Sequence, residues 1–355
     1  MVAIAALSVP RQMFRFGTFR DVGGSGPAFC PKGADGSAKR TRGESIYHTA
    51  GWQAVDGMRG TPPPAFADRV WIVTGANSGI GKTTALGLAH LGGTVVLACR
   101  DSTRGDLARL DIVRQTGNPH VALMLLDLSS QTSTRGFADE FQHTYPRLDA
   151  LVNNAGVFRR ERRTTVDGLE ETFSVNYLGG FLLTHLLLEH LKASAPSRIV
   201  NVSSSAHNGG RIDFDDLQGE RKYGGWRAYN QSKLAQVLFT YELARRLDGT
   251  GVTVNACHPG VIRTNLGRDD WPWIVNLFRP FFNSAERGAE TPIYLATSPE
   301  VADVTGNYFV KQKPRASSRL SRDPGLARRL YEVSLDLARF RASPIGVRKE
   351  GLSFL

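Results

Sequence analysis

The chain has few cysteines and lacks a long apolar run. Its 355 residues include three cysteines, Cys30, Cys99 and Cys257, which are widely spaced and odd in number. This pattern fits neither a disulfide framework nor a metal site, so no metal is expected and a reducing compartment, the cytoplasm, is the simplest expectation. The most apolar stretch, 181–191, contains polar residues and is shorter than the roughly 18 residues of a membrane span. It predicts a buried helix.

The central part of the chain has no net charge. Residues 1–66 contain eight Lys and Arg against four Asp and Glu, and residues 311–355 contain eleven against four, which together make the whole net charge of +11. Residues 67–310 balance at 25 against 25. The charge pattern therefore indicates basic ends rather than a basic binding face, and nucleic acid is not an expected partner.

Residues 1–66 also lack sustained hydrophobic periodicity, and they predict a disordered basic leader. The first twenty residues contain Arg11, Arg15 and Arg20 but no acid, which is similar to an organelle transit peptide. Alternatively, Met58 just before the folded part indicates an over-long start. Both interpretations stay open, and organelle targeting stays open with them.

From Asp68 onward, short β-branched runs alternate with helical stretches. This alternation predicts βαβ units and a parallel sheet in one α/β domain over residues 67–312. The expected strands cover residues 70–73, 94–98, 121–126, 149–152, 198–202, 252–257 and 306–310. Residues 313–355 predict a basic tail with one amphipathic helix, which Asp323 caps and Pro324 opens.

A glycine-rich turn lies between the first expected strand and its helix. The stretch 74–81 reads Thr-Gly-Ala-Asn-Ser-Gly-Ile-Gly. Glycines let the backbone turn tightly and approach a pyrophosphate, which can rest on the N–H groups of the following helix. The turn therefore predicts a dinucleotide site that includes Gly75, Asn77, Ser78, Gly79, Ile80 and Gly81.

The end of the second expected strand bears on the choice of cofactor. An acid there would bind the ribose 2′-hydroxyl of NAD, whereas the chain has Cys99 and Arg100. Arg100 can pair with a 2′-phosphate, which favours NADP(H), although Asp101 beside it keeps NAD(H) open. Further along, Asp127 and Leu128 end the third strand, where a carboxylate can accept from the adenine amino group.

Small and amide residues follow the fourth expected strand. Asn153, Asn154, Ala155 and Gly156 lie where parallel sheets bind ligands, and the two asparagines also suit a turn. We expect both roles to operate.

Tyr229 and Lys233 are four residues apart on one expected helix and therefore share a face. A neighbouring ammonium favours the phenolate, so Lys233 is expected to lower the pKa of Tyr229 and to make it an acid/base. A serine at the end of the preceding strand, 203–205, can hold the same substrate oxygen. By itself this spacing is common on helix surfaces.

Aromatic residues are concentrated in residues 270–282. We interpret the segment 267–286 as an apolar lid over a substrate pocket. A dimer contact and a patch that rests on a membrane surface remain alternatives.

Taken in order along about 245 residues, the glycine turn, Asn-Asn-Ala-Gly, the strand-end serine and Tyr-x-x-x-Lys resemble the short-chain dehydrogenase/reductase family. Stretches 74–82, 98–101, 198–204 with Ala206 and His207, 216–218 and 258–261 are similar to its retinol dehydrogenase branch. The resemblance implies a Rossmann-like, doubly wound sheet of about seven parallel strands. It also implies a homo-oligomer and hydride transfer between NAD(P)(H) and a carbonyl or alcohol carbon.

The resemblance also assigns roles to residues of this chain. It implies that Tyr229 is the acid/base, that Lys233 is its partner and holds the nicotinamide ribose, and that Ser204 binds the substrate oxygen. Asn176 matches a helix-bending asparagine that supports a bridging water. The implied cofactor contacts extend to Pro259, Gly260, Val261 and Thr264.

The expected function is therefore NADP(H)-dependent oxidation or reduction of a retinal-like or other lipophilic substrate. Two alternatives remain: a non-catalytic NADP(H) sensor or scaffold, and an isomerase or dehydratase on the same fold. The polar, basic leader departs from the hydrophobic anchor of the branch members found in animal membranes. Contact with a membrane surface, but no span, stays open.

Overall fold

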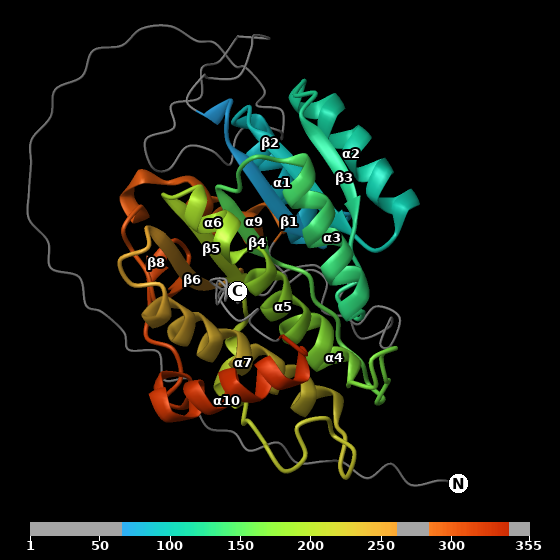
Figure 1. Ribbon diagram of the computed structural model, residues 1–355, viewed down its shortest axis with the longest axis vertical. Helices are drawn as coiled ribbons and strands as arrows, with labels where there is room; N and C mark the ends of the chain where they lie inside the picture. The colour runs from blue at the N-terminus through green and yellow to red at the C-terminus, as the bar shows by residue number, and fades with distance from the viewer. Residues whose placement is uncertain (1–65, 261–283, 341–355) are drawn as a thin grey trace, which may run out of the picture. The chain divides into compact units, whose positions relative to one another are not determined.

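The computed structural model describes residues 66–260 and 284–340. Eight strands form one sheet in the order β3-β2-β1-β4-β5-β6-β7-β8, and the pairs from β3 to β7 are parallel (Figure 1). The strands are β1 (Val70–Thr74), β2 (Thr94–Cys99), β3 (Val121–Leu125), β4 (Ala150–Asn153), β5 (Ser197–Val202), β6 (Val252–His258), β7 (Asn307–Val310) and the antiparallel β8 (Lys313–Pro314).

Helices cover both faces of the sheet. Along β1, Val70 and Ile72 belong to one buried cluster, whereas Trp71 and Val73 belong to the other. The second cluster includes residues of α1 (Gly79–His90), α2 (Ser102–Thr116) and α9 (Ala285–Thr297). The first includes residues of α3 (Gln131–Thr144), α5 (Gly179–Leu186), α6 (Leu188–Ala193), α7 (Gly225–Arg246) and α10 (Pro324–Leu337). Burial on both faces is why these strands are nearly continuous apolar runs.

The order of the strands determines where a ligand can bind. β1 pairs with β2 on one side and with β4 on the other, so the direction in which the chain crosses the sheet reverses between β1 and β4. In such sheets the crevice at the carboxyl ends of the strands, at this reversal, is the usual ligand site. The glycine turn after β1 and the loop after β4 both border it.

The seven strands expected from the sequence are present, and their parallel pairing is confirmed. The eighth strand was not predicted. β8 follows a tight turn whose residues Lys311 and Gln312 have φ angles of 52° and 60°. Such turns usually contain glycine or asparagine, so the sequence carries no signal for this hairpin.

The helix expected over the apolar stretch 181–191 belongs to a longer helical region, 171–193, that is divided. It consists of α4 (Glu171–Phe173), a π-helical turn (Ser174–Leu178), α5 and α6. The wider π turn surrounds Asn176. Such turns insert an extra residue into a helix and are frequent at functional sites.

The C-terminal helix is part of the same core. As predicted, the Asp323 carboxylate caps α10, since it accepts hydrogen bonds from the backbone N–H groups of Gly325 and Leu326 at 2.8 and 3.0 Å. The Tyr331 hydroxyl lies 2.7 Å from His185 Nε2 in α5. The boundary predicted at residue 312 therefore divides two segments that share one core.

Among residues 66–260 and 284–340, no helix combines the length and the apolar character needed to cross a bilayer.

Candidate active site

The glycine turn forms a close backbone junction between β1 and α1. Gly75 and Gly79 have φ angles of +67° and +54°, which residues with a side chain rarely adopt. A Cβ atom on Gly81 would lie 2.4 Å from both Asn154 Nδ2 and the Gly75 carbonyl oxygen. The turn therefore needs glycine at these positions.

The residues after β4 are bonded directly to this turn. The Thr74 hydroxyl oxygen accepts hydrogen bonds from the backbone N–H groups of Asn154 and Ala155, each at 3.0 Å. Asn154 Nδ2 donates to the Thr74 carbonyl oxygen at 2.8 Å. The two loops on either side of the strand reversal are thus one unit, to which Thr74 contributes a contact that the sequence pattern alone does not reveal.

This junction fits a dinucleotide. Helix α1 begins at Gly79 without a side-chain cap, so Ser78 leaves the N–H groups of the first turn for another acceptor. Asn77, Ser78 and Ile80 are half-buried around it. A pyrophosphate is such an acceptor, because free N–H groups and the helix dipole favour anions.

At the end of β2, Cys99 is buried, whereas Arg100 and Asp101 are exposed. Burial raises the pKa of the Cys99 thiol to about 11. The Asp101 carboxylate accepts from the backbone N–H of Arg104 at 2.9 Å and caps α2. Asp101 therefore has a structural task of its own, and Arg100 has no hydrogen bond or ion pair among the described residues.

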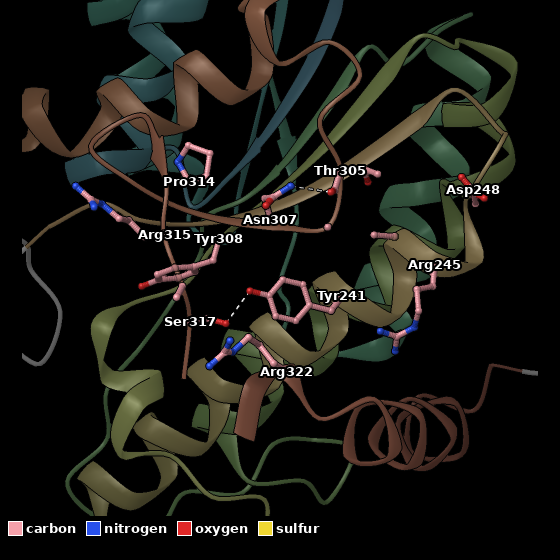
Figure 2. Close-up of a pocket in the computed structure, with 13 residues that line it drawn as sticks. Tyr241, Arg245, Asp248, Thr305, Asn307, Tyr308, Pro314, Arg315, Ser317 and Arg322 are labelled. Atoms are coloured by element: carbon pink, nitrogen blue, oxygen red, sulfur yellow. Dashed lines mark hydrogen bonds between the residues drawn. The ribbon is translucent and has the colours of Figure 1, made fainter. Parts of the chain in front are cut away.

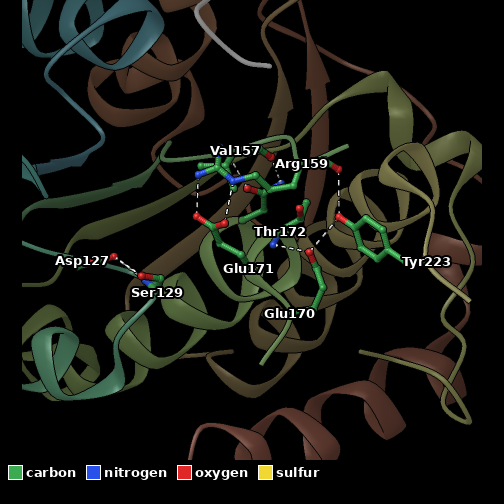
Figure 3. Close-up of polar contacts among 9 residues, drawn as sticks. Asp127, Ser129, Val157, Arg159, Glu170, Glu171, Thr172 and Tyr223 are labelled. Carbon is green, nitrogen blue, oxygen red and sulfur yellow. Dashed lines mark hydrogen bonds and ion pairs between the residues drawn. The ribbon is translucent and has the colours of Figure 1, made fainter. Parts of the chain in front are cut away.

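Asp127 and Leu128 follow β3. Asp127 Oδ1 accepts from the backbone N–H and the hydroxyl of Ser129 at 2.9 and 2.6 Å (Figure 3). Within the described residues Oδ2 has no hydrogen-bond partner. The side chain of Leu128 is buried in the core, which leaves its backbone as the part that can face a ligand.

The three serines after β5 differ in orientation. Ser203 donates its hydroxyl hydrogen to the Lys233 carbonyl oxygen at 2.9 Å and is buried, and Ser205 is exposed. Ser204 is half-buried and hydrogen bonds with the Tyr229 phenol. Its Oγ also accepts from the backbone N–H of Ala206 at 3.2 Å. Ser204 is thus the serine that the fold brings to the tyrosine.

The tyrosine and the lysine lie on one face of α7, as their spacing predicts. Lys233 Nζ lies 5.6 Å from the centre of the Tyr229 ring and donates to the Val202 carbonyl oxygen at 3.1 Å and to Gln236 Oε1 at 3.0 Å. Both residues are buried, at 8% and 5% exposure. The Lys233 ammonium therefore lies close to both the end of β5 and the Tyr229 ring.

The expected lowering of the tyrosine pKa is wrong for this arrangement. Burial raises the pKa of Tyr229 to about 12, and the hydrogen bond with Ser204 opposes the rise only in part. Burial likewise lowers the pKa of Lys233 to about 8. Desolvation penalises both charged forms, and it outweighs the attraction between an ammonium and a phenolate that are not in contact.

Asn176 lies in the π turn and holds the loop after β4. Its Oδ1 accepts from the backbone N–H of Val157 at 2.7 Å, and its Nδ2 donates to the Val157 carbonyl oxygen at 3.0 Å. Nδ2 also lies 3.0 Å from Ser232 Oγ. A Cβ on Gly156 would lie 3.5 Å from Asn176 Oδ1 and 3.8 Å from Lys233 Nζ, so these three residues are neighbours.

An ion pair fastens the same loop to the start of the divided helix. Arg159 and Glu171 form two hydrogen bonds, at 2.8 and 2.7 Å, and both side chains are 12% exposed (Figure 3). Glu170 caps the helix by accepting from the backbone N–H groups of Thr172 and Phe173. Tyr223 donates to the Arg159 carbonyl oxygen at 3.0 Å. The loop that carries Gly156 is therefore held on both sides.

Two aromatic residues beside the predicted catalytic tyrosine were not anticipated. The ring centres of Phe158 and Trp226 lie 5.9 and 6.1 Å from that of Tyr229, and 4.9 Å from each other. Trp226 is 56% exposed, which is unusual for so large a side chain. A signal existed, because Trp226 precedes Tyr229 by three residues and must share its helix face.

After β6 the structure describes Pro259 and Gly260, both half-buried, and Gly260 has a φ angle of +94°. The predicted contacts Val261 and Thr264 lie outside the described residues, as do residues 267–283 of the proposed lid. Among the described residues there is no group of three or more His, Cys, Asp or Glu that could hold a metal ion.

A concavity of about 950 Å³ lies away from these residues, between the C-terminal half of α7, β7 and the chain after β8 (Figure 2). Tyr241, Tyr308, Ser317 and Arg322 are among the residues that line it. None of the predicted catalytic residues does. The residues predicted for catalysis therefore lie outside this concavity.

Comparison with known proteins matches residues 69–274 to the family model described as short chain dehydrogenase. The chain is 51% identical to retinol dehydrogenase 13 of Homo sapiens over 283 residues, which cover 77% of this chain and 86% of that protein.

Solved structures are also similar. One is that of a putative uncharacterized protein from Mycobacterium paratuberculosis, with a TM-score of 0.65 and 37% identity over 82% of this chain and 98% of that one. Another is a putative short chain dehydrogenase from Shigella flexneri complexed with NADP, with a TM-score of 0.56 and 25% identity over 70% of this chain and 98% of that one.

Proposed function

The chain belongs to the short-chain dehydrogenase family and is an alcohol/carbonyl oxidoreductase, and we propose that it uses NADP(H) and a lipophilic substrate, with Tyr229 as acid/base. One observation carries the proposal. Ser204, Tyr229 and Lys233 converge next to a glycine junction that fits a dinucleotide, at the reversal point of the sheet. The family's fold binds NAD(P), so the open questions are which cofactor and which substrate.

The charges at the end of β2 support NADP(H). A 2′-phosphate needs a cation that is not already paired, and Arg100 is exposed and unpaired within the described part of the chain. The carboxylate that would compete for a ribose hydroxyl, Asp101, already caps α2. The similar Shigella flexneri protein was solved with NADP.

When bound, the nicotinamide supplies or accepts the hydride. In reduction, the substrate carbon gains the hydride and its oxygen gains the proton of the Tyr229 hydroxyl. The Ser204 O–H donates a hydrogen bond to the same oxygen, a role that is compatible with its Oγ accepting from the Ala206 N–H. Two donors stabilise the negative charge that develops there. In oxidation the proton moves in the opposite direction, to the phenolate.

Lys233 and Asn176 support this proton transfer. The Lys233 ammonium lies behind Tyr229 and favours the phenolate once the phenol has lost its proton. Asn176 holds the loop of Gly156 against Lys233, and we propose that it supports a water that connects the lysine to solvent. That water would return a proton to Tyr229 after each turnover.

The aromatic residues support an apolar substrate. Phe158 and Trp226 give the space beside Tyr229 a hydrophobic wall, and planar or extended apolar groups pack well against such rings. The relative named retinol dehydrogenase 13 is consistent with this class. A retinal-like or other lipophilic aldehyde or ketone is therefore the proposed substrate.

The test follows the loss of NADPH absorbance, and separately of NADH absorbance, with a panel of retinal and medium-chain alkanals. We expect oxidation of NADPH at a kcat/KM at least about tenfold above that of NADH, because one charge-assisted contact to the 2′-phosphate is worth roughly that factor or more. A preference for NADH would contradict the role of Arg100 but not the chemistry. Tight cofactor binding without oxidation of either would favour the sensor or isomerase alternative.

We further propose a cytoplasmic location and a homo-oligomer. The free, buried thiols of Cys99 and Cys257 are consistent with a reducing compartment. Imaging of the full chain with a C-terminal fluorescent tag tests the location, and organelle staining would contradict it.

Light scattering during gel filtration tests the homo-oligomer, and a monomer mass near 38.8 kDa would contradict it.

A further inference from the structure

His207 connects the predicted catalytic serine to the C-terminal part of the chain. Its side chain is 1% exposed, and both ring nitrogens are used. Nδ1 lies 2.6 Å from the Ser204 carbonyl oxygen, and Nε2 accepts the backbone N–H of Ser318 at 3.1 Å. Since Nε2 accepts, Nδ1 must carry the hydrogen and donate a hydrogen bond to the Ser204 carbonyl oxygen. The neutral ring is therefore held in one tautomer between two segments 111 residues apart in sequence.

The segment on the far side of His207, residues 313–322, is called here the strap. It starts with β8 and ends with the 3₁₀ turn Leu320–Arg322. Ser317 Oγ lies 2.7 Å from the Tyr241 hydroxyl in α7, as Figure 2 shows, and Ser321 donates to Ser317 Oγ at 2.7 Å. Ser317 and Ser321 are buried. The strap is therefore attached to α7 by Ser317 and to the serine loop by Ser318.

These two attachments join the elements that carry the catalytic groups. Helix α7 bears Tyr229 and Lys233, and the serine loop bears Ser204. The ring of Tyr308 on β7 packs on His207 with centres 4.7 Å apart, which restricts the imidazole from the sheet side. The distance between the Ser204 hydroxyl and the Tyr229 phenol thus depends on a chain of contacts from α7 through Ser317 and Ser318 of the strap to His207. This chain of contacts is called here the clasp.

We propose that His207 is a positioning residue, and that the strap, acting through it, holds Ser204 at the place where it binds the substrate oxygen. The inference rests on the proposed function for its effect on turnover. Loss of the clasp should weaken the hydrogen bond from the Ser204 hydroxyl to the substrate oxygen, on which negative charge develops. Complete removal of such a donor costs roughly 10²–10³-fold in kcat. Displacement should cost less than removal, so we expect a fall in kcat of about 10- to 100-fold with little change in KM.

Three variants test this proposal. His207→Phe keeps an aromatic ring against Tyr308 but removes both hydrogen bonds. His207→Asn keeps a donor near the position of Nδ1 but cannot reach Ser318. Ser317→Ala loosens the strap at α7 and leaves His207 intact. The matched control is Ser334→Ala, because Ser334 in α10 makes an equivalent buried contact of 2.7 Å with the Tyr177 hydroxyl and touches neither attachment.

The expected result is a low kcat with an NADPH Kd within about twofold of wild type for both His207 variants, because neither attachment touches the glycine junction. A smaller loss is expected for Ser317→Ala and none for the control. Wild-type kcat in His207→Asn would overturn the role of the strap. A parallel loss of NADPH affinity and thermal stability in His207→Phe would reduce the residue to a general packing role and overturn the proposal.

A second measurement does not depend on turnover. In hydrogen–deuterium exchange of the full chain, Ser317→Ala should accelerate exchange in residues 313–322 and also in 204–209, which Ser317 does not contact. Faster exchange confined to 313–322 would contradict the coupling. If Ser317→Ala accelerates exchange in both segments but the wild type oxidises no NADPH, the link between the strap and the serine loop is supported and the proposed function is wrong.

Discussion

Lys233 Nζ lies 5.6 Å from the centre of the Tyr229 ring and donates its hydrogen bonds to Val202 and Gln236 instead. The lysine is therefore close enough to influence a phenolate, while its own hydrogen bonds are made elsewhere. Burial determines the protonation states of both side chains, since it raises the pKa of Tyr229 to about 12 and lowers that of Lys233 to about 8. At neutral pH Tyr229 is a phenol, which is ready to donate a proton.

Replacing Tyr229 with phenylalanine should abolish most turnover. General acid catalysis is typically worth about 10²–10⁴-fold, and Tyr229 is the acid in the proposed reaction. The NADPH Kd, measured by quenching of protein fluorescence, should change by less than about threefold, because only the hydroxyl is removed. A variant that retains more than a tenth of wild-type kcat would contradict the assignment of Tyr229.

The pH dependence should differ between the two directions. The phenol form that reduction needs is fully present well below pH 12, so kcat/KM for reduction should be flat from about pH 6 to about pH 9. Oxidation needs the phenolate, so its kcat/KM should rise about tenfold per pH unit from about pH 6 to about pH 8, above which Lys233 loses the charge that favours the phenolate. Stopped-flow rates in both directions check this. A plateau of the oxidation rate near neutral pH would show that the bound cofactor overrides burial.

Lys233 should give stability that increases with pH. Its pKa is about 8 in the folded chain, against an ordinary value of 10.5 for the unfolded one, so between these values the unfolded chain binds more protons and the free energy of unfolding rises with pH. Relative to Lys233→Met, wild type should gain roughly 2 kcal/mol between about pH 7.5 and about pH 9.5, at about 1.4 kcal/mol per unit. Urea unfolding at both values measures the difference. If the difference in the free energy of unfolding between wild type and Lys233→Met is the same at both pH values, the Lys233 amine is solvated and the prediction is wrong.

Gly81→Ala should weaken both cofactor binding and folding. The new Cβ would lie 2.4 Å from Asn154 Nδ2 and from the Gly75 carbonyl oxygen, which forces the two loops apart. Gly136→Ala is the matched control, because Gly136 is also helical and a Cβ added there would meet no atom within 4 Å. The control should be stabilised by about 0.5–1 kcal/mol. Calorimetry of NADPH binding together with melting temperatures separates the two cases.

Arg100→Ala should raise the KM for NADPH about tenfold or more and leave the KM for NADH nearly unchanged. The expected loss is that of one charge-assisted hydrogen bond to a phosphate, about 1.5–3 kcal/mol. Arg328→Ala, at an exposed arginine of α10, serves as the control for general charge effects. Equal changes for both cofactors would place Arg100 elsewhere than at the 2′-phosphate.

Local spacing predicted those parts of the site that depend on one element. The four-residue spacing of Tyr229 and Lys233 placed them on one helix face, and the glycines placed a tight turn after β1. Parallel strands also bring their carboxyl ends to one edge, so Asn154 was expected near that turn and hydrogen bonds to Thr74.

Features that depend on contacts distant in sequence were missed. The pKa of Tyr229 follows from burial against Phe158 and Trp226, which no spacing to Lys233 reveals. The attachment of Ser318 to His207 spans 111 residues. The sequence pattern of 173–192 is largely apolar, so it carries no sign of the π turn that Asn176 occupies.

The short strand β8 also protects the molecule from a hazard common to open sheets. An uncovered edge strand offers a row of backbone groups that a strand of another molecule can join, which leads to aggregation. Here the side of β7 that faces away from β6 is paired by the two residues of β8, the exposed Lys313 and Pro314. Proline has no N–H to offer and lysine carries a charge, so this side of the sheet ends in residues that discourage further pairing. The same strap that is proposed to hold Ser204 thus also hinders a strand of a second chain from pairing with this edge of the sheet.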